Sequence, residues 1–270
     1  MAGLAPLLVD IQAAIAAACD PSSGSYGGVV HVPSGIYLLD AGLKFPGNDN
    51  PNLNAQVTLQ GDGINSTVIY TNTPNLDLLT IARSHVSIKG IYFQGSQQQG
   101  TGRGIVISNP VNGKVLDSIH LEDVYVAATE REALYVPDGF PHLLSQPAYD
   151  RISVVTSYLR CWFDSNMVPD SGLAYIGRWN TTHRFTECQF TNFKGRALYL
   201  HGADGTSCRD CIFEAGDNSR PYVEGVGATS TLLDHSWFED HATSSPLAVF
   251  TKHDKASSNW VERDLIQRRA

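Results

Sequence analysis

The chain has 270 residues, of which 42% are hydrophobic and 17% charged, and its formal net charge at pH 7 is −8. The apolar content is enough for a continuous core, and the negative charge gives no attraction to nucleic acid or to an anionic membrane. Without a run of 18 apolar residues, the sequence also argues against a membrane-spanning helix.

An amphipathic helix is predicted within residues 1–20, where Leu7, Ile11 and Ile15 recur at helical spacing. This segment has no basic region ahead of its apolar residues, and Asp10 interrupts it. We therefore do not read it as a signal peptide and expect the protein to be made and folded in a cytoplasm.

Short strands separated by turn residues follow, without any further helical period. The first of these apolar runs are residues 29–32, 36–39, 57–59 and 67–70. Such a pattern predicts an all-β fold.

One template then recurs: an apolar-x-aromatic strand, a polar loop, and a second strand with alternating residues. Copies begin at Val124, Cys188, Cys211 and Ser236. Cys188 and Cys211 lie 23 residues apart, and Cys211 and Ser236 lie 25 apart. A period near 22 residues without helices is typical of a parallel β-helix, whereas the Leu-Asn ladder of leucine-rich repeats is absent.

We expect residues 1–270 to form a single domain. The helix in residues 1–20 should cover the unpaired strand edges at one end of the coils. The coils themselves are predicted for residues 28–250, and residues 258–270 are expected to form a C-terminal tail or a short amphipathic cap.

The cysteines are Cys19, Cys161, Cys188, Cys208 and Cys211. Their odd number and the length of the chain argue against a disulfide framework. The C-x-x-C at residues 208–211 has no second pair, and the histidines show no metal-ligand spacing. We therefore expect buried free thiols, with no metal and no cofactor.

Stacked coils place equivalent residues about 4.8 Å apart. Phe213 and Phe238 should accordingly stack inside the shaft, and Glu214 and Glu239, which follow them, should stack outside, with Asp217 nearby. Glycosidases need two carboxyl groups about 5–10 Å apart. If the chain is an enzyme, these three acids are the catalytic candidates; otherwise they are solvated surface carboxylates at a turn.

Two sets of tyrosines are predicted to face outward. Tyr135, Tyr199 and Tyr222 each lie eleven residues after the start of a template, and Tyr92 and Tyr125 form a second, weaker pair. Outward aromatic columns are buried between subunits, stack on sugar rings or are covered by a loop. We favour the subunit interface.

Residues 10–15 and 27–37 resemble the opening of the pectate-lyase-like superfamily of right-handed parallel β-helices, and residues 57–69 resemble its next coil. Within this superfamily the chain is similar to bacteriophage tailspikes and related trimeric virion proteins, and other members are polysaccharide lyases, hydrolases and epimerases. The resemblance implies a right-handed coil and a homotrimer. The calcium-binding carboxylate cluster of the lyases has no counterpart here, and Arg196 and Arg220 match the catalytic arginine by residue type only.

We favour a bacteriophage virion structural protein, because of the resemblance and three further observations. These are the missing signal peptide, the absence of an anchoring domain ahead of the coils and the lack of a convincing catalytic cluster. We expect a trimeric β-helix that decorates or stabilises a capsid as a cement protein, or projects as a spike. Expected partners are capsid or tail proteins and host surface polysaccharide, with neither nucleic acid nor membrane insertion. The alternative is a polysaccharide-degrading tailspike-type enzyme, either a lyase or a glycoside hydrolase.

Overall fold

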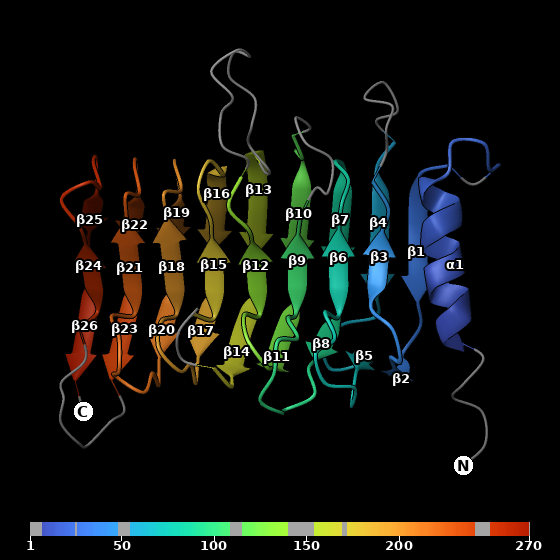
Figure 1. The fold of residues 1–270 in the computed structure, drawn as a ribbon, viewed down its shortest axis with the longest axis horizontal. Helices are drawn as coiled ribbons and strands as arrows, with labels where there is room; N and C mark the ends of the chain where they lie inside the picture. Colours follow the sequence, from blue (N-terminus) through green and yellow to red (C-terminus); the bar gives the residue numbers. More distant parts are fainter. Residues whose placement is uncertain are drawn as a thin grey trace.

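The computed structural model describes residues 7–24, 26–47, 55–108, 115–139, 154–168, 172–240 and 249–269. One helix, α1 (Leu7–Cys19), lies at one end of a shaft formed by three parallel sheets (Figure 1). The fold is a right-handed parallel β-helix with an N-terminal capping helix, and this confirms the fold class predicted from the repeats.

Each of the first eight coils contributes one strand to each of three sheets, so that sheet neighbours are three strands apart in the sequence, and the last coil described adds strands to sheets A and B only. Sheet A contains β1 (Gly28–Val32), β4 (Val57–Gly61), β7 (Val86–Lys89), β10 (Ile119–Glu122), β13 (Val154–Leu159), β16 (Thr181–Thr186), β19 (Ser207–Arg209), β22 (Leu232–Asp234) and β25 (Val261–Arg263). Sheet B contains β2 (Gly35–Leu38), β5 (Thr67–Tyr70), β8 (Tyr92–Gln94), β11 (Tyr125–Thr129), β14 (Trp162–Asn166), β17 (Gln189–Thr191), β20 (Ile212–Glu214), β23 (Trp237–Asp240) and β26 (Ile266–Arg269). Sheet C contains β3 (Leu43–Phe45), β6 (Leu79–Ile81), β9 (Ile105–Ile107), β12 (Leu134–Val136), β15 (Ala174–Ile176), β18 (Leu198–His201), β21 (Val223–Val226) and β24 (Thr251–His253).

From the third coil onward, the corner between sheets A and B is two residues long, and the first of them has a positive φ. In the later coils these residues are Asp123, Arg160, Glu187, Asp210, His235 and Asp264, with φ between 47° and 54°. This conformation costs a non-glycine residue about 1–2 kcal/mol, and the strand pairing on both sides holds it. The second corner residue points inward, which stacks Cys161, Cys188 and Cys211 as buried free thiols. The prediction of free, buried cysteines is confirmed for all five.

Aromatic side chains fill the shaft behind sheet B. Phe163, Phe190, Phe213 and Phe238 are partners in successive coils, and each is fully buried. Ring centroids of Phe190 and Phe213 are 4.8 Å apart, and those of Phe213 and Phe238 are 4.7 Å apart, with nearly parallel planes. The stack of Phe213 on Phe238 predicted from the template is confirmed.

Helix α1 covers the first coil in two ways. Ile11 and Ile15 are buried against the end of the shaft. The Gln12 side chain pairs with the edge strand β3: its Nε2 donates to the Lys44 carbonyl at 3.0 Å, and its Oε1 accepts from the Lys44 amide at 2.7 Å. An amide side chain thus replaces a neighbouring strand at an otherwise unpaired edge. In the described part of the chain, no helix is long and apolar enough to cross a bilayer.

The C-terminal segment differs from the prediction. Residues 258–270 were expected as a tail or amphipathic cap, but residues 261–269 form β25 and β26, which continue sheets A and B. Ile266 pairs with Trp237, 29 residues earlier, so this coil is longer than the template and escaped the repeat pattern. Val261 and Ile266 remain 49% and 52% exposed on this last coil.

Replacing Phe213 with alanine is expected to lower the free energy of unfolding by about 3–5 kcal/mol, because it opens a cavity within the aromatic column. Leu232→Ala, at an outward position of β22 on sheet A, should cost under about 1 kcal/mol. Chemical denaturation of the two variants measures both values. Equal losses would contradict the inward placement of the column.

Candidate functional site

The outer face of sheet C carries a column of three tyrosines. Tyr135, Tyr175 and Tyr199 pair residue to residue on β12, β15 and β18, and all three are half-buried. Their ring centroids are 5.3 and 5.5 Å apart along the column. Sequence reasoning missed Tyr175 because it lies fourteen residues after Cys161, three more than the template allows. The strand motif at Cys161, an apolar residue followed by two aromatic ones, is the signal that would have found this coil.

Tyr222 does not belong to this column, and its predicted outward position is wrong. The partner of Tyr199 is Glu224. Tyr222 is fully buried, with its hydroxyl donating to Asn218 Oδ1 at 3.1 Å. The loop before β21 spans residues 215–222 and is two residues longer than the loop 192–197 before β18, so a fixed offset stops short of the strand.

Guanidinium groups cover the ring faces of this column. The Arg103 Cζ lies 4.1 Å from the Tyr135 ring centroid, and the Arg196 Cζ lies 4.2 Å from that of Tyr199. Arg196 also pairs with the largely buried Glu224 through its Nε. Arginine therefore occupies one ring face of Tyr135 and one of Tyr199, and cation–π contacts and ion pairs fix these charged groups.

A closed hydrogen-bond network lies beside Tyr175. Its hydroxyl donates to Asp138 Oδ1 at 2.7 Å and lies 2.9 Å from His201 Nδ1. Arg178 Nε and Nη2 lie 3.2 and 3.0 Å from His201 Nε2. Because a guanidinium only donates, Nε2 must be the unprotonated ring nitrogen, and Nδ1 carries the proton.

Protonation in this network is set by Asp138 and Tyr175. Burial opposes ionisation of Asp138, but the hydrogen bonds from the Arg178 amide and the Tyr175 hydroxyl outweigh it and lower the pKa of the carboxyl group. Burial and the neighbouring Asp138 raise the pKa of Tyr175 well above its usual value. At neutral pH the carboxylate therefore accepts and the phenol donates.

A second outward column runs along sheet B, and we call it the sheet B stripe. Its members pair in register, and all of them are uncharged at neutral pH. They are Ile36, Val68, Tyr92, Tyr125, Trp162, Gln189, Ile212, Trp237 and Ile266. The ring centroids of Tyr92 and Tyr125 are 4.4 Å apart, and those of Tyr125 and Trp162 are 4.6 Å apart, in parallel stacks. Coplanar rings cannot approach so closely, so the rings lie face to face and expose their edges. Trp162 is a member that sequence reasoning missed.

The predicted carboxylates lie beside this stripe. Glu214 and Glu239 are direct partners on β20 and β23, whereas Asp217 lies in the following loop. Glu239 Oε2 accepts from Trp237 Nε1 at 3.0 Å. Asp217 Oδ1 accepts one hydrogen bond from the Ser219 hydroxyl and another, at 3.0 Å, from the Gly195 amide. The structure therefore brings the two glutamates together and gives Asp217 a turn-forming contact.

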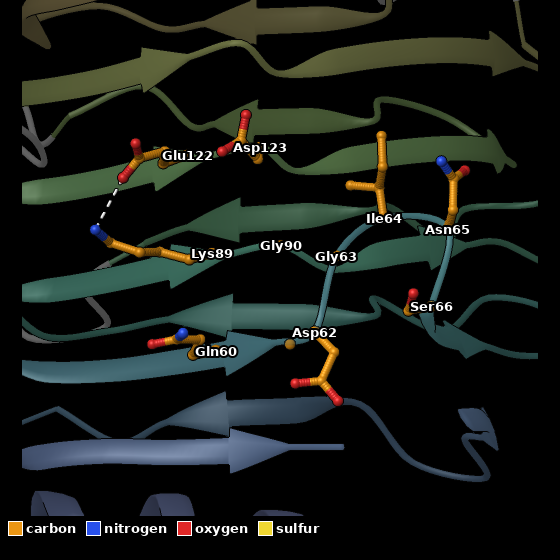
Figure 2. Close-up of a pocket in the computed structure, with 11 residues that line it drawn as sticks. Gln60, Asp62, Gly63, Ile64, Asn65, Ser66, Lys89, Gly90, Glu122 and Asp123 are labelled. Carbon is orange, nitrogen blue, oxygen red and sulfur yellow. Dashed lines mark ion pairs between the residues drawn. The ribbon is translucent and has the colours of Figure 1, made fainter. Parts of the chain in front are cut away.

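A hollow of about 660 Å³ lies at the corner between sheets A and B, lined by Asp62, Lys89, Glu122 and Asp123 among others (Figure 2). Its charged groups are already paired: Lys89 Nζ lies 2.8 Å from Glu122, Arg160 binds Glu122 and Asp123 at 2.8 and 2.7 Å, and Asp62 lies 2.7 Å from His31 Nε2. Hydrogen bonds from Lys89 and Arg160 lower the pKa of Glu122. These contacts make the corner an ion-pair ladder.

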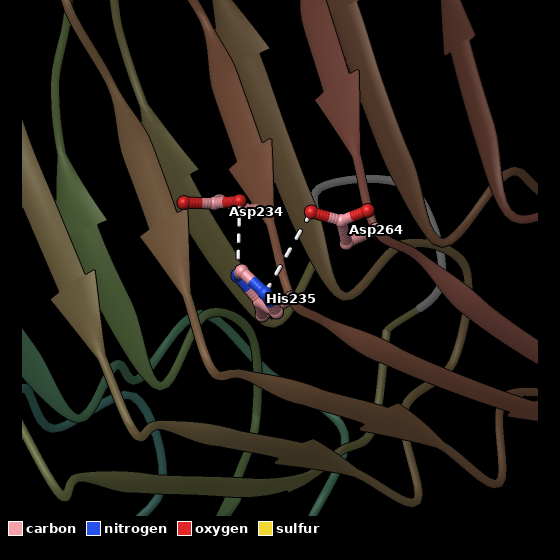
Figure 3. A group of neighbouring side chains, drawn as sticks. All are labelled: Asp234, His235 and Asp264. Atoms are coloured by element: carbon pink, nitrogen blue, oxygen red, sulfur yellow. Dashed lines mark ion pairs between the residues drawn. The ribbon is translucent and has the colours of Figure 1, made fainter.

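Asp234, His235 and Asp264 form a cluster whose ligand atoms lie within 4.8 Å of one another (Figure 3). Arg263 donates to both Asp234 oxygens, at 2.8 and 2.6 Å, and Arg209 lies 3.4 Å away. Two guanidinium groups repel a cation and occupy the lone pairs that would bind it. The contacts therefore form a second ion-pair network at the same corner rather than a metal centre.

The sequence matches no family model and no curated protein. Among solved structures, the chain is similar to ORF18 of Geobacillus virus E2, with 17% identity and a TM-score of 0.56 over 96% of this chain and 58% of that one. It is also similar to the Agl-KA catalytic domain (14% identity, TM-score 0.64, 97% of this chain and 45% of that one). The Dettilon tailspike protein is similar with 12% identity and a TM-score of 0.57, over 89% of this chain and 44% of that one. The chain spans about half the length of these proteins, and the similarity establishes the β-helix fold that the sequence resemblance implied.

Asp234→Asn is expected to lower the unfolding temperature at neutral pH, with the deficit shrinking as the pH falls toward 2. Hydrogen bonds from Arg263 lower the pKa of Asp234 in the folded protein to about 2, below its ordinary value of 3.8. The stabilisation is therefore complete above the unfolded pKa and is lost as the pH falls through the folded one. Thermal unfolding of both proteins from pH 7 to pH 2 measures the effect. A deficit that stays constant over this range would contradict the assignment.

Proposed function

We propose that this chain is a tailspike-like phage protein whose sheet C face contacts polysaccharide at the host surface. The observation that carries the proposal is the in-register column of Tyr135, Tyr175 and Tyr199, flanked by Arg103 and Arg196. It repeats hydroxyl and guanidinium groups beside aromatic carbon along the shaft, and polar groups placed on apolar surface fix the orientation of a bound ligand. The fold shared with a tailspike protein and a viral ORF product supports assignment to a phage particle.

Tyr199→Ala is expected to weaken polysaccharide binding by about tenfold, because the ring supports both Arg196 and Tyr175 in the centre of the contact surface. A matched control is Tyr70→Ala, which removes a half-buried tyrosine from the outer face of sheet B. Biolayer interferometry on purified capsular and O-antigen polysaccharides measures both affinities. Absence of binding to every polysaccharide, or equal affinity of the two variants, would contradict the proposal.

Cleavage of the polysaccharide is the second candidate function, and the pairing of Glu214 with Glu239 favours it. Paired residues on adjacent coils lie about 4.8 Å apart along the shaft, and glycoside hydrolysis uses two carboxyl groups about 5–10 Å apart. The Agl-KA catalytic domain shares the fold. Loss of depolymerase activity in Glu214→Gln, with binding retained, would identify these residues as the acid and base or nucleophile.

A homotrimer belongs to the same proposal, with the sheet B stripe between subunits. The stripe runs the whole length of the shaft and ends in Ile36 and Ile266, which are 59% and 52% exposed. An apolar column of this length on a rigid sheet suits burial against another subunit. The capsid cement role stays a prediction from the sequence.

Light scattering is expected to give a mass of about 88 kDa, three times the chain mass of 29.3 kDa. Trp162→Lys should reduce the mass to that of one chain, because it places a charge within the stripe. Thr58→Lys, on the outer face of sheet A, should leave the trimer intact. A wild-type mass of one chain would contradict the trimer and leave the polysaccharide proposal in place.

A further inference from the structure

The turn between β15 and β16 displays two neighbouring side chains of complementary chemistry, Arg178 and Trp179. Both are exposed, and Trp179, at 41%, is the one aromatic residue of the exposed class in the described part of the chain. Its φ is 63°. A bulky residue in the left-handed region costs about 1–3 kcal/mol and persists only where the surroundings enforce it.

Buried polar contacts enforce this turn. Asn180 is fully buried, and its Nδ2 donates to the carbonyls of Pro137 and Gly177 at 2.8 and 2.9 Å. The Gly139 amide donates to the Arg178 carbonyl at 2.7 Å. The turn is therefore tied to the preceding coil and presents its exposed side chains from a rigid base.

The guanidinium of Arg178 is fixed separately. Its stem crosses Gly202, where an added Cβ would lie 2.6 Å from Arg178 Cγ, and Gly202 has a φ of 64°. Its side edge, Nε and Nη2, faces His201 Nε2. Because His201 is itself held by Tyr175, the remaining edge of the guanidinium, Nη1 and Nη2, keeps one direction.

Charge pairing distinguishes Arg178 from the other arginines of this face. Arg103 binds Glu132 at 2.8 Å, and Arg196 pairs with Glu224. Within the described ranges, no carboxylate lies in ion-pair distance of the Arg178 side chain. The Arg178 guanidinium is planar and held in one orientation, and its outer edge faces no carboxylate of the described residues. Two of its N–H groups therefore match the two oxygens of a carboxylate group on a ligand.

We propose that Arg178 and Trp179 form a subsite for a sugar that bears a carboxylate, such as a uronate residue in an acidic polysaccharide. Two N–H groups of Arg178 bind the carboxylate, the indole of Trp179 packs against the carbon face of the ring, and His201 positions the guanidinium. This inference rests on the proposed polysaccharide contact of sheet C, and it adds the class of sugar and the residues that select it.

The test uses the full chain and immobilised alginate, polygalacturonate, hyaluronate and acidic capsular polysaccharides, each also in a form whose carboxylates are reduced to alcohols. We expect the wild-type protein to bind an acidic polymer and to lose about tenfold in affinity or more for its reduced form. Arg178→Gln should remove this discrimination, and Arg178→Lys should restore part of it as a charge without the fork. Arg184→Gln, an exposed arginine on sheet A with the same change in net charge, should bind as the wild type does.

The outcomes separate the inference from the proposed function. Binding that ignores carboxyl reduction and Arg178→Gln, but falls in Tyr199→Ala, would overturn the acidic subsite and keep the polysaccharide contact. Binding to none of these polymers, nor to neutral polysaccharides, would overturn both. If Arg178→Gln and Arg184→Gln equally lose the preference for the acidic polymer over its reduced form, that preference comes from net charge. This result would also overturn the subsite.

Discussion

In-register hydrogen bonding between successive coils repeats each side-chain position about 4.8 Å further along the shaft. Like positions are thereby forced into contact, whether they point in or out. Inside, this spacing suits aromatic rings, and Phe190, Phe213 and Phe238 stack at close to the same distance. Outside, it brings charged groups of successive coils together, and Asp234 lies between Arg209 and Arg263 on consecutive coils.

The outer faces differ in the kind of side chain that stacks on each of them. The corner of sheets A and B carries ion pairs between acids and bases of neighbouring coils, which neutralise one another and leave little for a ligand to bind. Sheet B stacks apolar and aromatic residues, a surface suited to another subunit. Sheet C carries tyrosines on consecutive coils, flanked by arginines that their neighbours hold in place. The division places the proposed polysaccharide contact and the proposed subunit contact on separate sheets.

The repeat predicted the fold because strand and corner residues obey the stacking constraint, whereas loop lengths do not. The Phe213–Phe238 stack and the pairing of Glu214 with Glu239 follow from strands that directly succeed a short corner. Tyr222 was misplaced and Tyr175 missed because the loops leading to sheet C vary in length.

Residues outside the strands were harder still to predict. Arg178 and Trp179 gave no sequence signal, since their presentation depends on Asn180, Gly202 and His201 from two different coils. Their place in the site follows from contacts that only the folded chain brings together.

The most direct measurement of the central claim is a crystal structure of the protein with an oligosaccharide cut from a polymer that it binds. We expect the sugar chain along sheet C, across Tyr135, Tyr175 and Tyr199, with an acidic residue on Arg178. A sugar chain bound beside Glu214 and Glu239 on sheet B, or in the hollow around Asp62, would contradict it.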